Sequence, residues 1–395
     1  MRSIILSGGG FVNKGAQAMT LICICELQKR YPEHQLYLLT WNAGDSEKIR
    51  HENYRIKLLQ IPPLKFSCAA HNHLRKHLYS VRYRRTFTEA DEIYRSTDLF
   101  IDISGYALGS NWSAKICNDY LDNIEHALAY EIPVYLFPQS FGPFDWRDEE
   151  GKRIDQRIRR LFPRIRTICA REEEGYRALV NQYGLEDNTI QCKDMVLTSR
   201  LNDYSPALKH KNEGILPEIE ENSVCVIPNV RIAETGIRNP QEIYCSVIRE
   251  LLAQDITVYL LYHSSQDREL CLELKDKYEE DERVVFLDND FSCIEFNELV
   301  RKFNFVIASR FHALVHALKN GVPCIALGWA VKYVELMKLF GQERYVFDLS
   351  QEVDIPAVTH VVREMSQKWK RETNNILEAL PELQKENVFD SIERL

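Results

Sequence analysis

Short apolar runs alternate with amphipathic stretches along most of the chain. Two of the runs read Val-Cys-Val-Ile at 224–227 and Phe-Val-Ile-Ala at 305–308, and polar or turn-forming residues follow each of them. Uninterrupted apolar runs of this length are typical of parallel strands that are buried on both faces. Strands that alternate with helices predict parallel sheets covered by helices. The sequence therefore predicts an α/β fold made of doubly wound, Rossmann-like units.

The same pattern predicts two domains. We expect strands at 3–7, 35–40, 99–104, 133–138, 167–171, 223–228, 256–262, 283–287, 305–309 and 323–328, and helices at 16–31, 114–131, 242–254 and 311–320. The pattern stops at 200–222, a polar segment with two prolines and one glycine, which is typical of a linker. We therefore expect an N-terminal Rossmann-like domain at 1–199 and a C-terminal one at 223–355. Helices at 356–395 are expected to pack back on the first domain.

Composition limits the class of protein. The 395 residues include 45% hydrophobic and 27% charged residues and carry a net charge of −8. This argues against a disordered chain and against a dedicated nucleic-acid binder, which normally has a basic excess. The 11 cysteines contain no CxxC pair and suit a reducing compartment. The apolar part of 1–7 is too short for a signal peptide, and no run approaches a membrane span of about 20 residues. We expect a cytoplasmic protein.

Glycines, amides, hydroxyls and cations follow the predicted strands, where α/β proteins bind ligands. In the first half these residues are Gly10, Asn13, Gly15, Gln17, Gln139, Ser140 and Arg171. The loop at 8–17 is neither GxGxxG nor a P-loop, so dinucleotide and nucleoside triphosphate sites are not indicated. A glycine turn that serves only strand–helix packing is the alternative. If the carboxyl ends of both sheets face each other, these residues border an interdomain cleft.

The strongest candidate site begins at Ser309. We expect Ser309 to be the N-cap of a helix whose first-turn amides bind an anion. Arg310 offers a fork for phosphate or carboxylate, and His312 offers a general acid or base. Lys332, after the strand at 323–328, would complete a cationic pocket, and Arg171 would add charge from the other half. The alternative is a capped helix with a surface arginine and a buried histidine.

A metal site is not expected. His316 lies four residues after His312 on one helix face, which is a spacing that metal ligands use. The glutamate of HExxH is missing and no third ligand is apparent. We interpret His316 as a core residue or as a residue that supports His312.

Several motifs occur in an order that resembles a known family. They are Asn-Lys-Gly-Ala-Gln-Ala at 13–18, Pro-Gln-Ser-Phe-Gly-Pro at 138–143, Ala-Arg-Glu at 170–172, Lys-Asp-Met-Val-Leu at 193–197, Ser-Arg-Phe-His-Ala-Leu at 309–314 and Gly-Val-Pro-Cys-Ile-Ala-Leu at 321–327. Together these motifs resemble the polysaccharide pyruvyl transferase family, from residue 4 to about residue 337.

The resemblance implies a fold like that of GT-B glycosyltransferases. It implies phosphoenolpyruvate as co-substrate, no other cofactor, and a hydroxyl pair of a sugar or lipid-linked glycan as acceptor, joined as a pyruvate ketal. It places Arg310, His312 and Lys332 on the donor site, where Arg171 would join them. From the residues themselves we expect His312 to be the catalytic acid and Ser309 to bind the donor as well. The acceptor side would be the first domain. A helix N-terminus with two cations suits a donor that carries a carboxylate and a phosphate.

Other functions stay open. A GT-B glycosyltransferase would use Glu335 for ribose and Arg231 and Lys332 for the diphosphate of a nucleotide sugar. A two-domain protein that binds a sugar or an anion without catalysis is a further alternative. The basic segment 65–85 predicts peripheral contact with the inner face of an anionic membrane, or else a solvated helix. The oligomeric state is not indicated.

Overall fold

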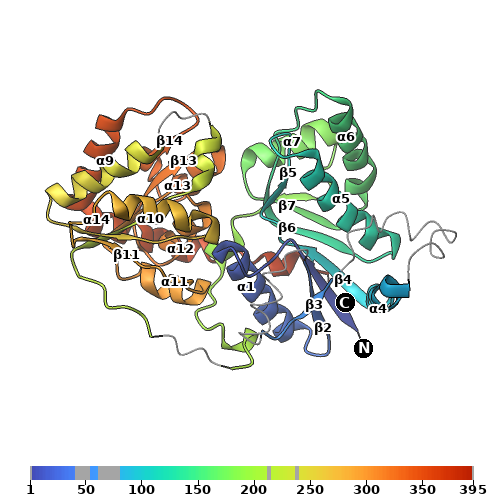
Figure 1. Ribbon diagram of the computed structural model, residues 1–395. Helices are drawn as coiled ribbons and strands as arrows, with labels where there is room; N and C mark the ends of the chain where they lie inside the picture. The colour runs from blue at the N-terminus through green and yellow to red at the C-terminus, as the bar shows by residue number, and fades with distance from the viewer. Residues whose placement is uncertain (1, 41–53, 61–80, 211–214, 236–239, 394–395) are drawn as a thin grey trace.

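A computed structural model describes residues 2–40, 54–60, 81–210, 215–235 and 240–393 (Figure 1). The first sheet is parallel throughout and has the order β3-β2-β1-β4-β6-β7-β8, with β5 paired to β6. Its strands are β1 (Ser3–Ser7), β2 (Gln35–Leu39), β3 (Lys57–Leu59), β4 (Thr97–Asp102), β5 (Tyr106–Leu108), β6 (Val134–Phe141), β7 (Thr167–Ala170) and β8 (Thr189–Gln191). The helices that connect them are α1 (Lys14–Arg30), α4 (Val81–Arg95), α5 (Ala114–Ala129), α6 (Glu149–Leu161), α7 (Glu173–Tyr183) and α8 (Met195–Thr198). We call this unit the first domain.

The second sheet is also parallel, in the order β11-β10-β9-β12-β13-β14. This is the strand order of the Rossmann fold, in which strands are added first on one side of the first strand and then on its other side. The strands are β9 (Ser223–Ile227), β10 (Thr257–Leu260), β11 (Val284–Phe286), β12 (Phe305–Ala308), β13 (Cys324–Gly328) and β14 (Val346–Asp348). The helices are α9 (Pro240–Ala253), α10 (Arg268–Asp276), α11 (Cys293–Val300), α12 (Phe311–Lys319) and α13 (Val331–Lys338). We call this unit the second domain.

The two topological switch points meet between the domains. In the first domain the switch point lies between β1 and β4, and in the second it lies between β9 and β12. Helix α1, which follows β1, packs against α11 and α12 of the second domain and lies between the two sheets in Figure 1. Asn13 at the start of α1 also forms a β-bridge with Ser264, which follows β10. The loops that bind ligands in such folds therefore face each other.

The C-terminal segment links both domains. Helix α14 (Ile355–Leu383) packs against α9 of the second domain. The chain then continues to the first domain, where the Phe389 ring contacts Phe137 at 5.0 Å between centroids and the amide of Glu393 donates to the Tyr135 hydroxyl. The predicted linker also contributes to packing, since Tyr204 and Ala207 are buried.

The predicted fold class is confirmed, with small errors in the elements. All ten predicted strands are present within a few residues of their expected ends. Four more strands, β3, β5, β8 and β14, were not predicted, because each has only three residues and is too short to show a period. The basic segment at 65–85 lies outside the described residues, except for the backbone of the start of α4. No helix in the described part of the chain has the length and apolar character to cross a bilayer.

Gln17 makes a hydrogen bond that joins the two domains, and this contact can be tested. Its side-chain oxygen accepts from the amide of Cys293 in α11 at 2.6 Å, and its nitrogen donates to Tyr54 at 2.7 Å. Gln17→Ala should lower the free energy of unfolding by about 2 kcal/mol, because both bonds are lost from a buried site. Urea unfolding measures this. Gln28→Ala, on the same helix with one exposed hydrogen bond, is the control and should change stability by less than about 0.5 kcal/mol. Equal effects of the two substitutions would argue against the interdomain role.

Candidate functional site

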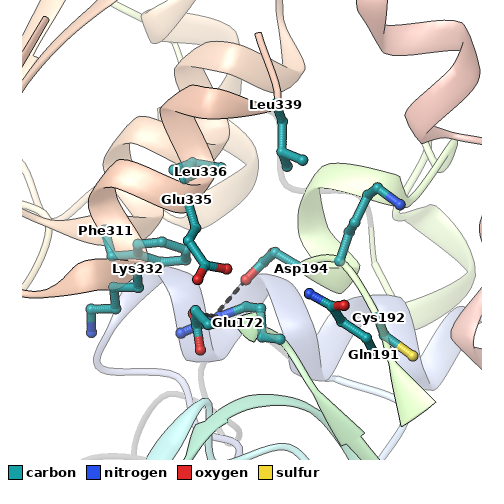
Figure 2. A pocket seen from close by; sticks show the side chains of 11 residues that line it. Glu172, Gln191, Cys192, Asp194, Phe311, Lys332, Glu335, Leu336 and Leu339 are labelled. Carbon is teal, nitrogen blue, oxygen red and sulfur yellow. Dashed lines mark hydrogen bonds and ion pairs between the residues drawn. The ribbon is translucent and has the colours of Figure 1, made fainter. Parts of the chain in front are cut away.

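Residues of both domains line a cavity of about 250 Å³ between the carboxyl ends of the two sheets (Figure 2). The first domain contributes Arg171, Glu172, Gln191, Cys192, Lys193 and Asp194, and the second contributes Phe311, Lys332, Glu335, Leu336 and Leu339. Figure 2 shows the carboxylates of Glu172, Asp194 and Glu335 around the same space. The cavity therefore has the place that a doubly wound fold predicts for a ligand.

Arg171 lies at the centre of a buried cluster of charges. Its guanidinium donates to Glu172 at 2.7 Å, to Asp194 at 2.9 Å and to the Ser140 hydroxyl at 2.7 Å. The central carbon of the guanidinium, Cζ, also lies 4.2 Å from the centre of the Phe311 ring in the second domain. The structure places Arg171 beside the cleft, with Ser140 in contact with it. However, Arg171 is paired with two carboxylates within its own domain.

His312 crosses the cleft to face Asp194. The distance from Nε2 of His312 to Oδ2 of Asp194 is 3.5 Å, and the histidine side chain is 15% exposed. The other oxygen of Asp194 accepts from the backbone amides of Val196 and Leu197, so the carboxylate also caps α8. A carboxylate that is held by a helix start and an arginine gives the imidazole a fixed partner and orients its ring.

The surroundings of Asp194 keep it ionised. Burial by itself would raise the pKa of this carboxyl. The hydrogen bond and charge of His312, the charge of Arg171 and the α8 amides outweigh burial and hold the pKa well below its usual range. The negative charge facing His312 is therefore present across the physiological pH range.

Gly15 leaves the space that the His312 ring occupies. A Cβ atom added to Gly15 would lie 2.3 Å from Cγ and 2.4 Å from Nδ1 of His312. Any larger residue at position 15 would displace the ring. The glycine loop and the histidine helix, which the sequence analysis treated as separate candidates, therefore form one contact across the cleft.

The predictions for Ser309 and Arg310 need correction. Ser309 was expected to cap α12, but the N-cap is Arg310, and no side chain bonds to the first-turn amides. The Ser309 side chain is fully buried, and its hydroxyl lies 2.7 Å from the Tyr244 hydroxyl. Ser309 directly follows the last residue of β12, so it lies at the end of the sheet, before the helix begins. Arg310 was expected to be available for an anion. Its guanidinium instead makes two hydrogen bonds to the fully buried Asp267, at 2.6 and 2.7 Å.

Lys332 is a cation of the cleft that no carboxylate neutralises. Its ammonium makes no hydrogen bond or ion pair with another residue that the structure describes. It lies 5.2 Å from the centre of the Tyr106 ring, 5.4 Å from that of Phe311 and 5.8 Å from that of Tyr333. Burial, followed by the positive charge of Arg171, lowers the pKa of Lys332 to about 8. An anionic ligand would therefore find this ammonium available.

Glu335 closes the second-domain side of the cavity. One oxygen of its carboxylate accepts from the backbone amide of Glu173, at the start of α7 in the first domain, at 2.9 Å. Burial raises the pKa of Glu335 above its usual value. A carboxylate at a helix start is electrostatically favourable, so this contact holds α13 and α7 together.

Most residues expected on the acceptor side have structural roles. The Asn13 side chain caps α1, and the Gly10 amide donates to Thr20. Gln139 is fully buried, where it donates to Asp102 and accepts from Tyr120. Gln17 links α1 to α11, as described above. Only Gly15 and Ser140 of this group touch the charged residues of the cleft.

The carboxylates of the site were not predicted from the sequence. Asp194 lies in the motif at 193–197 that was noted only as part of the family resemblance, and its position as a helix N-cap was the available signal. Asp267 follows β10 by several residues, and only the tertiary structure brings it to Arg310. Sequence patterns identify a cation at a strand end, but they do not show which carboxylate neutralises it.

The histidines behind His312 form no metal site in the described residues. Nδ1 of His316 lies 3.3 Å from the side-chain oxygen of Asn297, and burial lowers the pKa of His316 to about 3. His263, whose ring centre is 6.1 Å from that of His316, is also buried, and burial lowers its pKa well below the usual range. Both rings are therefore neutral parts of the core behind the site.

Solved structures share this architecture. UDP-GlcNAc 2-epimerase of Methanocaldococcus jannaschii, in complex with UDP-GlcNAc and UDP, aligns over 93% of each chain with a TM-score of 0.57 and 14% identity. TarM of S. aureus, solved with Fondaparinux, alpha-GlcNAc-glycerol and UDP, aligns over 100% of this chain and 99% of its own with a TM-score of 0.58 and 8% identity. At such identities the likeness is one of fold, and it defines a protein of the GT-B type.

The sequence comparison identifies the family. The model of the family described as polysaccharide pyruvyl transferase matches residues 13–330. The chain therefore belongs to the polysaccharide pyruvyl transferase family, a family of transferases. The amylovoran biosynthesis protein AmsJ of Erwinia amylovora is 20% identical over 355 residues, which cover 83% of this chain and 81% of AmsJ.

The contact between Gly15 and His312 predicts coupling between the two positions. Gly15→Ala should destabilise the protein by about 1–3 kcal/mol, because the new methyl group overlaps the imidazole. In a His312→Gly background, which also removes the Cβ of His312 that would lie 2.6 Å from the new methyl group, the same substitution should be neutral or should stabilise by up to about 1 kcal/mol, since alanine favours helix. Urea unfolding of the four proteins in this double-mutant cycle measures the coupling. Equal effects in both backgrounds would show that the two residues do not meet.

Proposed function

We propose that this protein transfers the pyruvyl group of phosphoenolpyruvate to two hydroxyls of a sugar unit in a glycan, with formation of a pyruvate ketal. The observation that carries the proposal is the pairing of His312 with the ionised Asp194 across the cleft, beside Lys332, in a chain of this family. The proposal requires no cofactor besides phosphoenolpyruvate. The setting would be the cytoplasm, where glycan precursors and this donor occur together.

The proposed reaction balances without an outside oxidant or reductant. A proton adds to the methylene carbon of the donor, and positive charge develops at the carbon that carries the phosphate. One sugar hydroxyl attacks that carbon and loses its proton. Phosphate then leaves with its bonding electrons, and the second hydroxyl attacks the same carbon and also loses its proton. One of the two released protons replaces the proton taken up by the methylene, and the other leaves on the phosphate.

His312 is the group best placed to deliver the first proton. Asp194 faces Nε2, so Nδ1 would be the nitrogen that serves the substrate. A carboxylate that holds one imidazole nitrogen fixes the tautomer and aims the other nitrogen. Asp194 and Arg171 are therefore positioning residues in this proposal, and His312 is the catalytic acid.

The donor charges would bind to Lys332 and to the start of α12. No side chain in the described part of the chain caps this helix, so the amides of Phe311 and His312 would be available to an anion, and the helix dipole favours negative charge there. Lys332 lies against the Phe311 ring at the start of the same helix. Arg171 and Arg310 would shape the site while they remain paired with carboxylates.

The nucleotide-sugar alternative has less support. Its proposed ribose ligand, Glu335, binds the α7 backbone of the other domain. The fold likeness to UDP-dependent proteins does not carry their ligands to this chain, because the identities are below 15%.

Replacement of His312 tests the catalytic assignment. His312→Asn should lower phosphate release from phosphoenolpyruvate by about 10²- to 10⁴-fold, which is the usual contribution of a general acid. The assay measures phosphate release in the presence of galactosides, glucosides and N-acetylmannosaminides. His34→Asn, which changes a histidine far from the cleft, is the control and should keep wild-type turnover. Near-normal turnover by the His312 variant would refute the assignment.

Lys332 predicts a pH dependence of donor binding. The ammonium is charged below its pKa of about 8 and neutral above it. The KM for phosphoenolpyruvate should therefore rise as the pH increases from 7 to 9, by up to about tenfold per pH unit above the pKa. Lys332→Arg keeps its charge over this range and should flatten the rise, whereas Lys332→Met should have a high KM at every pH. Initial rates across the pH range measure this, and an unchanged pH profile in Lys332→Arg would contradict the role.

A further inference from the structure

Two aromatic side chains of the first domain border the cleft beside Lys332. The rings of Tyr106 and Trp112 lie 5.3 Å apart in an edge-to-face arrangement. Each faces a cation of the second domain, since Lys332 lies over Tyr106 at 5.2 Å and Arg231 lies over Trp112 at 5.7 Å. These two rings, which we call the aromatic wall, therefore lie opposite two cations of the second domain.

A second hollow lies on the first domain next to this wall. It has a volume of about 350 Å³ and is lined by Phe144, Trp146, Lys152, Asp155 and Gln156. The three polar residues come from α6, and the aromatic residues come from the loop that precedes it. A concave site with aromatic walls and a few polar groups is typical of a small-ligand site.

Hydrogen bonds place the hollow beside the aromatic wall. The Tyr106 hydroxyl donates to the carbonyl of Gly142 at 2.8 Å. The amide of Ser110 donates to the carbonyl of Pro143 at 2.7 Å, and the amide of Asp145 donates to the Ser110 hydroxyl. The loops after β5 and β6 therefore run side by side at the carboxyl edge of the sheet, and the helices that follow them, α5 and α6, are neighbours (Figure 1).

The charges of the hollow favour a neutral ligand. Lys152 is paired with Glu149 at 2.7 Å, and Asp155 accepts from Tyr183 at 2.8 Å and from Arg159 at 2.9 Å. No charge therefore dominates the lining. Aromatic faces with amide and carboxylate groups complement a ring that has apolar C–H faces and hydroxyl edges. A neutral sugar unit has this chemistry.

We propose that the hollow at Trp146 binds a second sugar unit of the acceptor, while Tyr106 and Trp112 bind the unit that reacts. The acceptor is then a chain of at least two sugars, extending from the cleft over the loops 109–112 and 142–146. This assignment rests on the proposed function for the identity of the acceptor. The hollow itself is a site for glycans that is distinct from the donor pocket.

A binding experiment tests this subsite independently of catalysis. Full-length labelled protein is applied to immobilised galactosides, glucosides and N-acetylmannosaminides with one, two or four units. In at least one series the wild-type protein should bind the two-unit glycan roughly tenfold more tightly than the single sugar, because the second unit gains its own contacts. Trp146→Ala should remove this gain and leave binding of the single sugar unchanged.

Gln156→Ala provides a variant that does not depend on aromatic packing. Gln156 is exposed, so the fold should be kept, and the gain with length should fall roughly threefold. Gln182→Ala, an exposed glutamine on α7 outside the hollow, is the matched control and should behave as wild type. If no series shows a gain with length, or if the gain persists in both Trp146→Ala and Gln156→Ala, the subsite is refuted. Glycan binding with this length dependence but no phosphate release from phosphoenolpyruvate would refute the transfer reaction and leave the subsite intact.

Discussion

The Asp194 carboxylate is the group on which the site depends. One of its oxygens caps α8, and the other binds Arg171 and faces His312. Helix α8 packs against α12 of the second domain, so the carboxylate acts at the contact between the two domains. Removing one partner of a buried charge cluster commonly costs about 3–5 kcal/mol, because the remaining charges lose compensation. The position of the histidine is therefore coupled to the assembly of both Rossmann-like units.

The electrostatics of the cleft differ from the simple cationic pocket that the sequence predicts. The two arginines are neutralised by three carboxylates, Glu172, Asp194 and Asp267. Such pairing fixes each guanidinium fork in a single geometry. It also keeps buried arginines from repelling one another in a site where burial makes charge costly. The cleft thus holds buried ion pairs beside the ammonium of Lys332.

Much of the fold could be predicted from the sequence, and part of the site could be. The apolar runs at 224–227 and 305–308 predict central strands because burial on both faces requires continuous apolar residues. The ends of β12 and β13 then locate His312 and Lys332, since ligands bind at carboxyl edges. The partners of the cations could not be predicted, because Asp267 reaches Arg310 only through the packing of β10 beside β9. Gln17 and Gln139 were expected to contact a ligand because each follows a predicted strand. Buried amides that hold the core together occur at the same positions in the sequence as amides that bind ligands, so the sequence does not distinguish the two.

Whether a cationic side chain is paired with a carboxylate decides whether it can bind an anionic ligand. To take either arginine, an anion would have to displace a buried carboxylate, at a cost of about 3–5 kcal/mol for the pair that is broken. To bind Lys332, an anion has only to replace the contacts of the ammonium with aromatic rings. Such a cation–π contact is worth about 0.5–2 kcal/mol. In the proposed function, Lys332 is therefore the cation that would respond to an anionic donor, and the two arginines would be parts of the framework. Because one of the rings that Lys332 would leave is Tyr106, binding of an anion on the second domain would also uncover an aromatic face on the first.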